Sequence, residues 1–248
     1  EDIKKRLLGK VRSRTYRECL GSDELLATMG TRDNTHICLN KGQNYGFYND
    51  KKSFSVKIVY IQPPTSEQEA PLLYIKPDTA VHNRELPLYI PDFTSDLRGQ
   101  AVLLIKISKQ GKCISDRFAS KYYEQVSLGL ALTAYDRQKE LQAAARPWEL
   151  ATAFDGSMVV GSFLPIHLLQ QEETVAVFSE NGAVIEQLPL QQTLQRLPLA
   201  LQIVSEYLTL RTGDVLALPL TDVLYSMKGD TTWEATIQTE RLFSVTVK

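Results

Sequence analysis

The stretch TAYDRQKELQAAARPWELATAFDGS, residues 133–157, carries most of the information about the fold. Strong helix formers fill residues 139–145, Asp136 stands upstream as a candidate N-cap, and Pro147 closes the run because proline cannot continue a helix. Asp136 and Glu140 could act as an acid–base pair on one helix face, although capping and solvent exposure explain them equally well. The glycines of residues 156–161 resemble a phosphate loop in spacing only, since no Lys follows them, and we interpret the stretch as a turn.

Outward from this stretch, short β-branched runs alternate with turn residues, which is typical of strands. Asn181-Gly182 lies between two such runs and predicts a hairpin. Leucines and a valine recur every three or four residues over 193–208 and predict an amphipathic helix. Pro198 lies inside this range, where a proline can bend a helix. Few helices among many strands predict an α+β fold with a large mixed sheet. The expected strands are residues 56–60, 72–75, 100–108, 174–178, 183–187 and two within 233–248.

Composition restricts the function classes. The 248 residues have a net charge of -1, 43% hydrophobic and 23% charged residues, and no uninterrupted apolar run of the length that a membrane helix needs. The sequence pI of about 6.4 offers no basic face for nucleic acid. The 3 cysteines are widely spaced and form no CxxC motif, which argues against zinc and a disulfide framework. We expect a cytoplasmic protein that binds neither nucleic acid nor membrane.

A change of composition divides the chain near residue 55. Residues 1–55 hold 11 Lys and Arg against 7 Asp and Glu, whereas residues 56–248 hold 17 against 22, and all 11 prolines lie in the second part. We therefore expect a basic N-terminal extension of unknown role, poorly ordered, followed by one domain over residues 56–248.

Four motifs follow one another along the chain: LLYIKPDTAV at 72–81, TAYDRQ at 133–138, PWELATAFDGS at 147–157 and LTLRTGDVLAL at 208–218. In this order they resemble the fumarylacetoacetate hydrolase superfamily, in its small acylpyruvate hydrolase branch. The resemblance implies a mixed β-roll with few short helices, commonly a homodimer, which cleaves or isomerises 2,4-dioxo acids with Mg²⁺ or Mn²⁺. Such a cation needs several oxygen ligands, chiefly carboxylates.

Carried over position by position, the resemblance implies that the metal and catalytic residues are absent. The family's three metal carboxylates fall on Gln100, Val102 and Ala131. Tyr135 replaces the Arg of the family's TARD motif, and Thr152 replaces its Lys. The stretch 62–70, where the family has a lid helix with Glu and His, contains no His. We therefore predict no cofactor and no metal-dependent catalysis.

Three hypotheses about function remain. The first is a degenerate family member acting as a partner or ligand-binding subunit, as a homodimer or in a heteromer with an active paralogue. The second is an active hydrolase or isomerase on an acylpyruvate-like 2,4-dioxo acid, with a rebuilt, metal-independent site. The third is a sensor for a small organic acid. The candidate catalytic groups of the rebuilt site are Lys76, Asp136 and Glu67 or Glu69. The candidate residues of a vestigial pocket are Lys76, Asp136, Gln138 and Thr152. The candidate ligand-binding residues are Lys76, Thr79 and Asp155.

Overall fold

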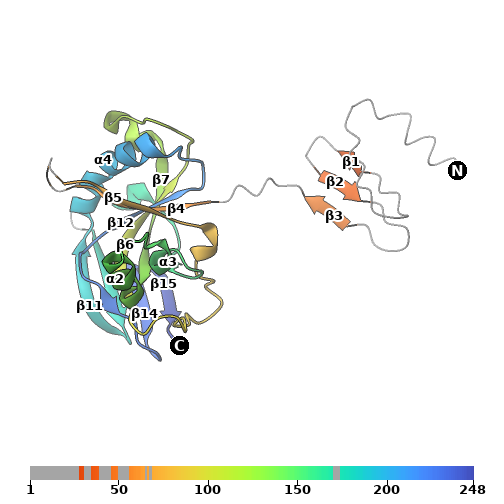
Figure 1. Cartoon of the computed structure of the whole chain (residues 1–248). Coiled ribbons are helices and arrows are strands. Elements are labelled where there is room, and N and C mark those ends of the chain that lie inside the picture. The colour runs from red at the N-terminus through yellow and green to blue at the C-terminus, as the bar shows by residue number, and fades with distance from the viewer. Residues whose placement is uncertain are drawn as a thin grey trace. The chain divides into compact units, whose positions relative to one another are not determined.

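The computed structural model describes residues 28–30, 35–38, 46–49, 56–64, 66, 69–169 and 174–248 and divides the chain into two units, Glu1–Phe54 and Ser55–Lys248 (Figure 1). In the first unit, β1 (Thr28–Gly30), β2 (Thr35–Cys38) and β3 (Gly46–Asn49) form an antiparallel sheet in that order. The expectation of poor order for residues 1–55 concerns mainly residues outside the described ranges and stays a prediction.

The second unit is built on a mixed sheet with the order β5-β4-β12-β6-β7-β8. The pairing of β4 with β12 is parallel, and the other neighbours along this path run antiparallel. Beyond β5, Val81 forms a parallel bridge with Met158 of β8, so the two ends of the path meet and the sheet closes into a roll. The bounds are β4 (Ile58–Gln62), β5 (Leu72–Lys76), β6 (Leu97–Ile107), β7 (Tyr123–Ala134), β8 (Met158–Val160) and β12 (Val215–Pro219), with β9 (Leu164–Pro165) beside β7 and β13 (Tyr225–Ser226) beside β6.

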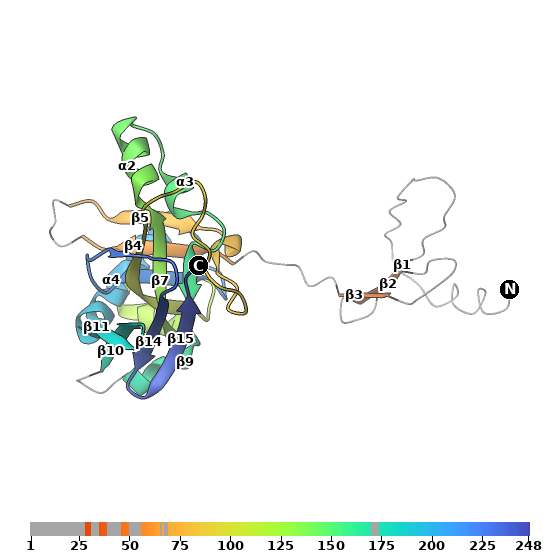
Figure 2. The ribbon, with the colours of Figure 1, turned by 90° about the horizontal axis from the view of Figure 1, so that it is seen from below.

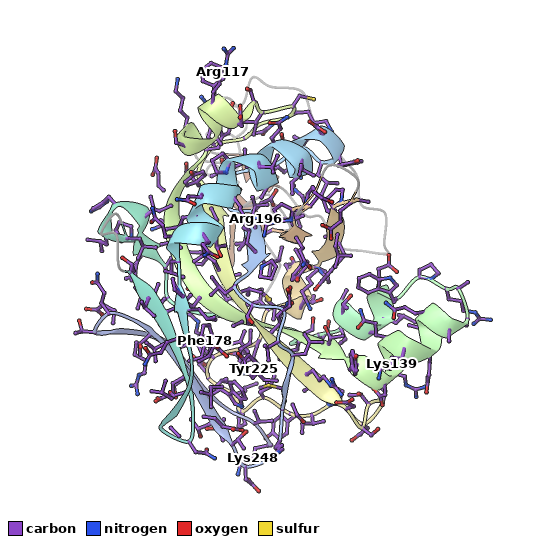
Figure 3. The ribbon with its side chains drawn as sticks, turned by 90° about the vertical axis from the view of Figure 1, so that its left-hand side faces the viewer. Arg117, Lys139, Phe178, Arg196, Tyr225 and Lys248 are labelled. Atoms are coloured by element: carbon purple, nitrogen blue, oxygen red, sulfur yellow. The ribbon has the colours of Figure 1, made fainter. Side chains whose placement is uncertain are left out.

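A second sheet, in the order β11-β10-β14-β15, contributes to the same core. Its first two strands, β10 (Val175–Glu180) and β11 (Ala183–Pro189), confirm the hairpin expected at Asn181-Gly182. The tail forms β14 (Thr232–Ile237) and β15 (Glu240–Thr246), as expected. Phe178 of β10 is fully buried in this core (Figure 3).

Helix α4 (Gln191–Tyr207) confirms the helix expected from the leucine spacing and contains Pro198. Its apolar stripe, which includes Leu197, Leu201 and Val204, is buried in the core, and the helix contacts β4 and β12 (Figure 1). Among the described residues, no helix is long and apolar enough to span a membrane.

Helix α2 (Tyr135–Ala143) begins earlier than expected, and the prediction of Asp136 as its N-cap is wrong. The N-cap is Ala134, which makes no side-chain capping bond, and Asp136 lies in the first helical turn. The helix follows β7 directly, so the strand sets where it starts. Figure 2 shows α2 and the short α3 (Glu149–Thr152) beside each other at one end of the unit, and Figure 3 shows Lys139 of α2 at its periphery. The described residues of this unit also form the 3-10 helices η1 (Asp78–Ala80), η2 (Asp116–Lys121) and η3 (Ile166–Leu169).

Both fold expectations, the α+β class and the mixed sheet with few helices, are confirmed. The strands expected at 56–60, 72–75 and 100–108 correspond to β4, β5 and β6 with shifted ends. Strand β7, which pairs with β6 along nearly its full length, was not expected. Its pairing places Ala131 opposite Gln100 and Thr133, at the start of the 133–157 stretch, opposite Arg98.

Candidate functional site: the roll face around Gln100

The three positions Gln100, Val102 and Ala131 lie together on one face of the roll. Gln100 of β6 and Ala131 of β7 are direct cross-strand partners, and Val102 follows Gln100 on the same face because side chains alternate along a strand. Val102 is 0% and Ala131 2% exposed. Both belong to what we call the small cluster, whose buried members are Ile58, Tyr60, Val102, Leu104, Ala131, Met158, Val215 and Ala217. Two of the three positions are therefore part of a hydrophobic packing unit.

The third position, Gln100, makes two hydrogen bonds within the protein through its amide. The hydroxyl of Tyr60 donates to Gln100 Oε1 at 2.8 Å, and Gln100 Nε2 donates to the carbonyl oxygen of Thr221 at 2.8 Å. Burial raises the pKa of Tyr60 well above its usual range, although the bond to Gln100 works in the opposite direction, so the hydroxyl stays a donor. The one side-chain oxygen that could face a cation already accepts a hydrogen bond.

These residues do not fit a Mg²⁺ or Mn²⁺ ion. Such ions take several hard oxygen ligands, usually with carboxylates among them, whereas a valine, an alanine and one amide that already accepts a hydrogen bond supply at most one neutral oxygen. Within the part of the chain that the structure describes, no group of three or more His, Cys, Asp or Glu residues is placed to hold a metal ion. These three positions therefore supply no carboxylate to a metal ion.

Aromatic rings extend from the small cluster toward α3. Tyr60 and Tyr74 are cross-strand partners on β4 and β5, and their rings stack with centroids 4.5 Å apart at 13°. The Tyr74 ring meets the edge of Trp148 at 5.4 Å, and burial holds the pKa of Tyr74 well above its usual range. Sequence reasoning overlooked both tyrosines. Each tyrosine lies on a strand that was expected from the sequence, but the register in which the two strands pair could not be read from the sequence.

Lys76 is enclosed by the protein. Its side chain is 0% exposed, and Nζ donates to the carbonyl oxygens of Leu132 at 3.0 Å and Ser157 at 3.0 Å, to the Ser157 hydroxyl at 3.2 Å and to the carbonyl of Thr152. Burial lowers the pKa of Lys76 to about 7, since no carboxylate is among these partners. The amine ties the end of β7 to the α3–β8 turn. A ligand could reach Nζ only by displacing these oxygens.

Thr152, at the position of the family's Lys, is also buried. Its side chain is 1% exposed, its hydroxyl donates to the carbonyl of Glu149 at 3.5 Å, and its own carbonyl accepts from Lys76. Thr152 therefore supports the Lys76 enclosure through its backbone.

Asp136 has a different neighbourhood from Lys76. Its carboxylate accepts hydrogen bonds from the Thr94 hydroxyl, from the backbone N–H and hydroxyl of Ser95, and from the backbone N–H of Arg137. Desolvation alone would raise the pKa of Asp136, but these donors outweigh it and hold the pKa well below its usual range. An ionised, fully hydrogen-bonded carboxylate at a helix start is a structural feature, and a weak proton acceptor.

A guanidinium lies beside the position where the family has its Arg. Arg98 of β6 stacks on the ring of Tyr135, with its Cζ 3.8 Å from the ring centroid, and makes a two-point ion pair with Asp96 through Nε at 2.9 Å and Nη2 at 2.8 Å. Arg98 is half-buried and points to the same face of β6 as Gln100. Gln138, one turn after Tyr135 on α2, is also half-buried.

The remaining expected residues are dispersed. Thr79 is exposed on η1, and its carbonyl accepts a hydrogen bond from the N–H of Gly156 at 3.2 Å. Asp155, which precedes Gly156 in the chain, is also exposed. Glu69 is exposed, and Glu67 lies outside the described residues. The hydrogen bonds found for Lys76 and Asp136 in the described residues involve neither the Thr79 nor the Asp155 side chain. Their roles in binding or catalysis stay predictions.

Comparison with known families gives one match over most of the chain. Residues 39–218 match the family described as fumarylacetoacetate (FAA) hydrolase C-terminal. The match begins within the first unit and ends within β12, so it includes all of the face that carries Gln100, Val102 and Ala131.

Several curated relatives are proteins named oxaloacetate tautomerase. The mitochondrial one of Caenorhabditis elegans is 30% identical over 146 residues, which is 58% of this chain and 68% of that protein. The mitochondrial one of Bos taurus is 27% identical over 147 residues, 59% of this chain and 66% of that protein, and the one of Escherichia coli is 28% identical over 149 residues, 59% and 68%. The chain thus spans about two thirds of the length of these relatives.

Solved structures share the fold at lower identity. The fumarylpyruvate hydrolase of Pseudomonas aeruginosa, in complex with Mn²⁺ and pyruvate, has a TM-score of 0.68 at 19% identity and covers 93% of this chain and 99% of its own. The 5-carboxymethyl-2-hydroxymuconate delta-isomerase of Mycobacterium smegmatis has a TM-score of 0.67 at 16% identity, covering 90% and 93%.

Proposed function

Because the chain belongs to the fumarylacetoacetate hydrolase C-terminal family, we propose that it is a member without the family's metal-dependent reaction, acting as a ligand-binding or partner subunit. The observation that carries this proposal is the composition of one face of the roll. Val102 and Ala131 pack in the small cluster, and the amide of Gln100 is used by Tyr60 and Thr221. Neutral residues there avoid the repulsion and desolvation that three buried carboxylates would cost without a cation.

A second candidate function is favoured by the relatives. Proteins named oxaloacetate tautomerase, at 26–30% identity, support an activity on a 2-oxo acid such as oxaloacetate or an acylpyruvate-like 2,4-dioxo acid. Moving a proton between carbon and the enol oxygen requires an anchor for the acid and a proton carrier, and neither has to be a metal. We propose Arg98 as the anchor. Its Nε and Nη2 each donate to Asp96, and the guanidinium has further N–H donors that can bind the carboxylate of a substrate.

One assay on the full chain separates these candidates. The enol of oxaloacetate is followed by its ultraviolet absorbance, with chelator and with added Mn²⁺. A rate equal to the uncatalysed rate in both conditions, with no hydrolysis of an acylpyruvate, is the expected result of the first proposal. A rate increase that persists in chelator establishes the second candidate. An increase that requires Mn²⁺ contradicts both.

If the chelator-resistant rate is found, a matched pair of variants tests the anchor. Arg98→Met should raise the KM for oxaloacetate, since the carboxylate loses its partner. Arg241→Met, which breaks an exposed ion pair with Glu234 on the second sheet, should leave KM unchanged. Equal KM values for both variants would remove Arg98 from the proposal.

We further propose that the subunit assembles, as a homodimer or with an active paralogue. Native mass spectrometry of the chain, alone and after expression beside such a paralogue, tests this. A monomer in both cases would overturn it.

A further inference from the structure

A cavity lies on the opposite side of the β6–β7 pair from Gln100. Its volume is about 270 Å³, and Leu97 and Leu132 form part of its wall. Leu97 precedes Arg98 on β6 and Leu132 follows Ala131 on β7, so alternation along each strand turns these leucines away from the face that carries Gln100. Leu86, Leu88 and Phe154 add further apolar surface. The cavity is therefore separate from the roll face discussed above.

One polar ring is buried in this apolar wall. His82 is 8% exposed, and its Nε2 lies 3.0 Å from the carbonyl oxygen of Leu86. A carbonyl can only accept, so Nε2 carries the hydrogen and donates it. Burial lowers the pKa of His82, although the bond to Leu86 acts in the opposite direction, so the ring is neutral near pH 7. In that tautomer Nδ1 is an acceptor with a free lone pair.

The space in front of Nδ1 is open. Among the bonds of the described residues, none involves His82 Nδ1. Gly156 also lines the cavity, and a Cβ built on it would have His82 Nδ1, at 4.0 Å, as the single heavy atom within contact range. The empty volume beside Gly156 thus borders the unpaired nitrogen. Nδ1 is not among the buried side-chain atoms without a partner, so water can reach it, and a ligand donor in the cavity would take the place of that water.

We propose that this cavity binds a small neutral ring compound that carries one hydroxyl or N–H group. The ring lies among Leu86, Leu97, Leu132 and Phe154, and the donor bonds to His82 Nδ1. The volume suits a single ring and is too small for a typical drug-sized molecule. The Asp155 carboxylate lies at the exposed rim, where water screens it, so a cation gains little there.

Phenol and toluene are matched probes, since they share the ring and differ in the donor. Calorimetric titration of the full chain should show saturable binding of one phenol, and toluene should bind about 5 to 10 times more weakly, as expected for one hydrogen bond. His82→Leu should weaken phenol by a similar factor and leave toluene unchanged. His167→Leu, at an exposed histidine on η3, should alter neither.

Several results would overturn the proposal: no saturable phenol binding, equal affinities for phenol and toluene, or the same loss in both histidine variants. If His82→Leu does not fold, the phenol and toluene comparison on the unchanged chain still decides. A phenol-induced shift of the His82 Nδ1 resonance in NMR spectra that is larger than the shift from toluene at equal occupancy supports the site, and equal shifts contradict it.

Discussion

Replacing Lys76 with methionine should change how stability depends on pH. In the folded chain burial lowers the pKa of Lys76 from 10.5 to about 7, and unfolding restores the higher value. Between these two values the unfolded chain binds a proton that the folded chain does not, so the free energy of unfolding rises with pH across that window. At about 1.4 kcal/mol per pKa unit, the rise is at most roughly 5 kcal/mol. The enclosing carbonyl oxygens favour the ammonium and reduce that figure.

Urea unfolding of the wild type and Lys76→Met at several pH values from 6.5 to 10 measures this effect. The difference in unfolding free energy should grow in favour of the wild type as pH rises, because methionine has no proton to release. Lys228→Met, at an exposed lysine, should show no such trend. A Lys76→Met difference that stays constant over the whole range would refute the reasoning, since it would mean that Lys76 keeps its proton while buried.

Three further changes test the packing around the roll and the hairpin. Tyr60→Phe leaves Gln100 Oε1 buried without a donor and should lower the unfolding free energy by about 1 to 3 kcal/mol in urea, whereas no loss would mean that water replaces the hydroxyl. Gly182 has a φ of +79°, and a Cβ added there would meet no atom within 4 Å, so Gly182→Ala should lower the free energy of unfolding by about 1 kcal/mol through backbone strain alone. An unchanged thermal midpoint would contradict that. The triple variant Gln100→Glu, Val102→Glu, Ala131→Asp should melt at a lower temperature in chelator and recover with Mn²⁺; a wild type that also gains stability from Mn²⁺ would contradict the account.

Much of the fold could be predicted because its signals are local. The leucine spacing of α4 and the Asn181-Gly182 turn depend on residues close in sequence. The start of α2 could not be predicted in the same way. Asp136 is a common N-cap residue, but here its carboxylate is held by Thr94 and Ser95, which come from a distant segment.

The candidate site was predictable in composition and not in arrangement. Aligned motifs pointed to Gln100, Val102 and Ala131, and the structure places the three on one face. The enclosure of Lys76 uses backbone carbonyls of Leu132 and Thr152, and a carbonyl has no signature in a sequence. The cavity at His82 escaped notice for a related reason: its wall is assembled from segments that only folding brings together, and a lone histidine had no local partner to mark it.

The most direct test of the central claim is a calorimetric titration of the chelator-treated full chain with Mn²⁺ and Mg²⁺. Because Gln100, Val102 and Ala131 offer no carboxylate and at most one neutral oxygen on the roll face, the account predicts only heats of dilution up to millimolar metal. Tight binding of one metal ion per chain would contradict it and place the chain among the metal-dependent enzymes of its family.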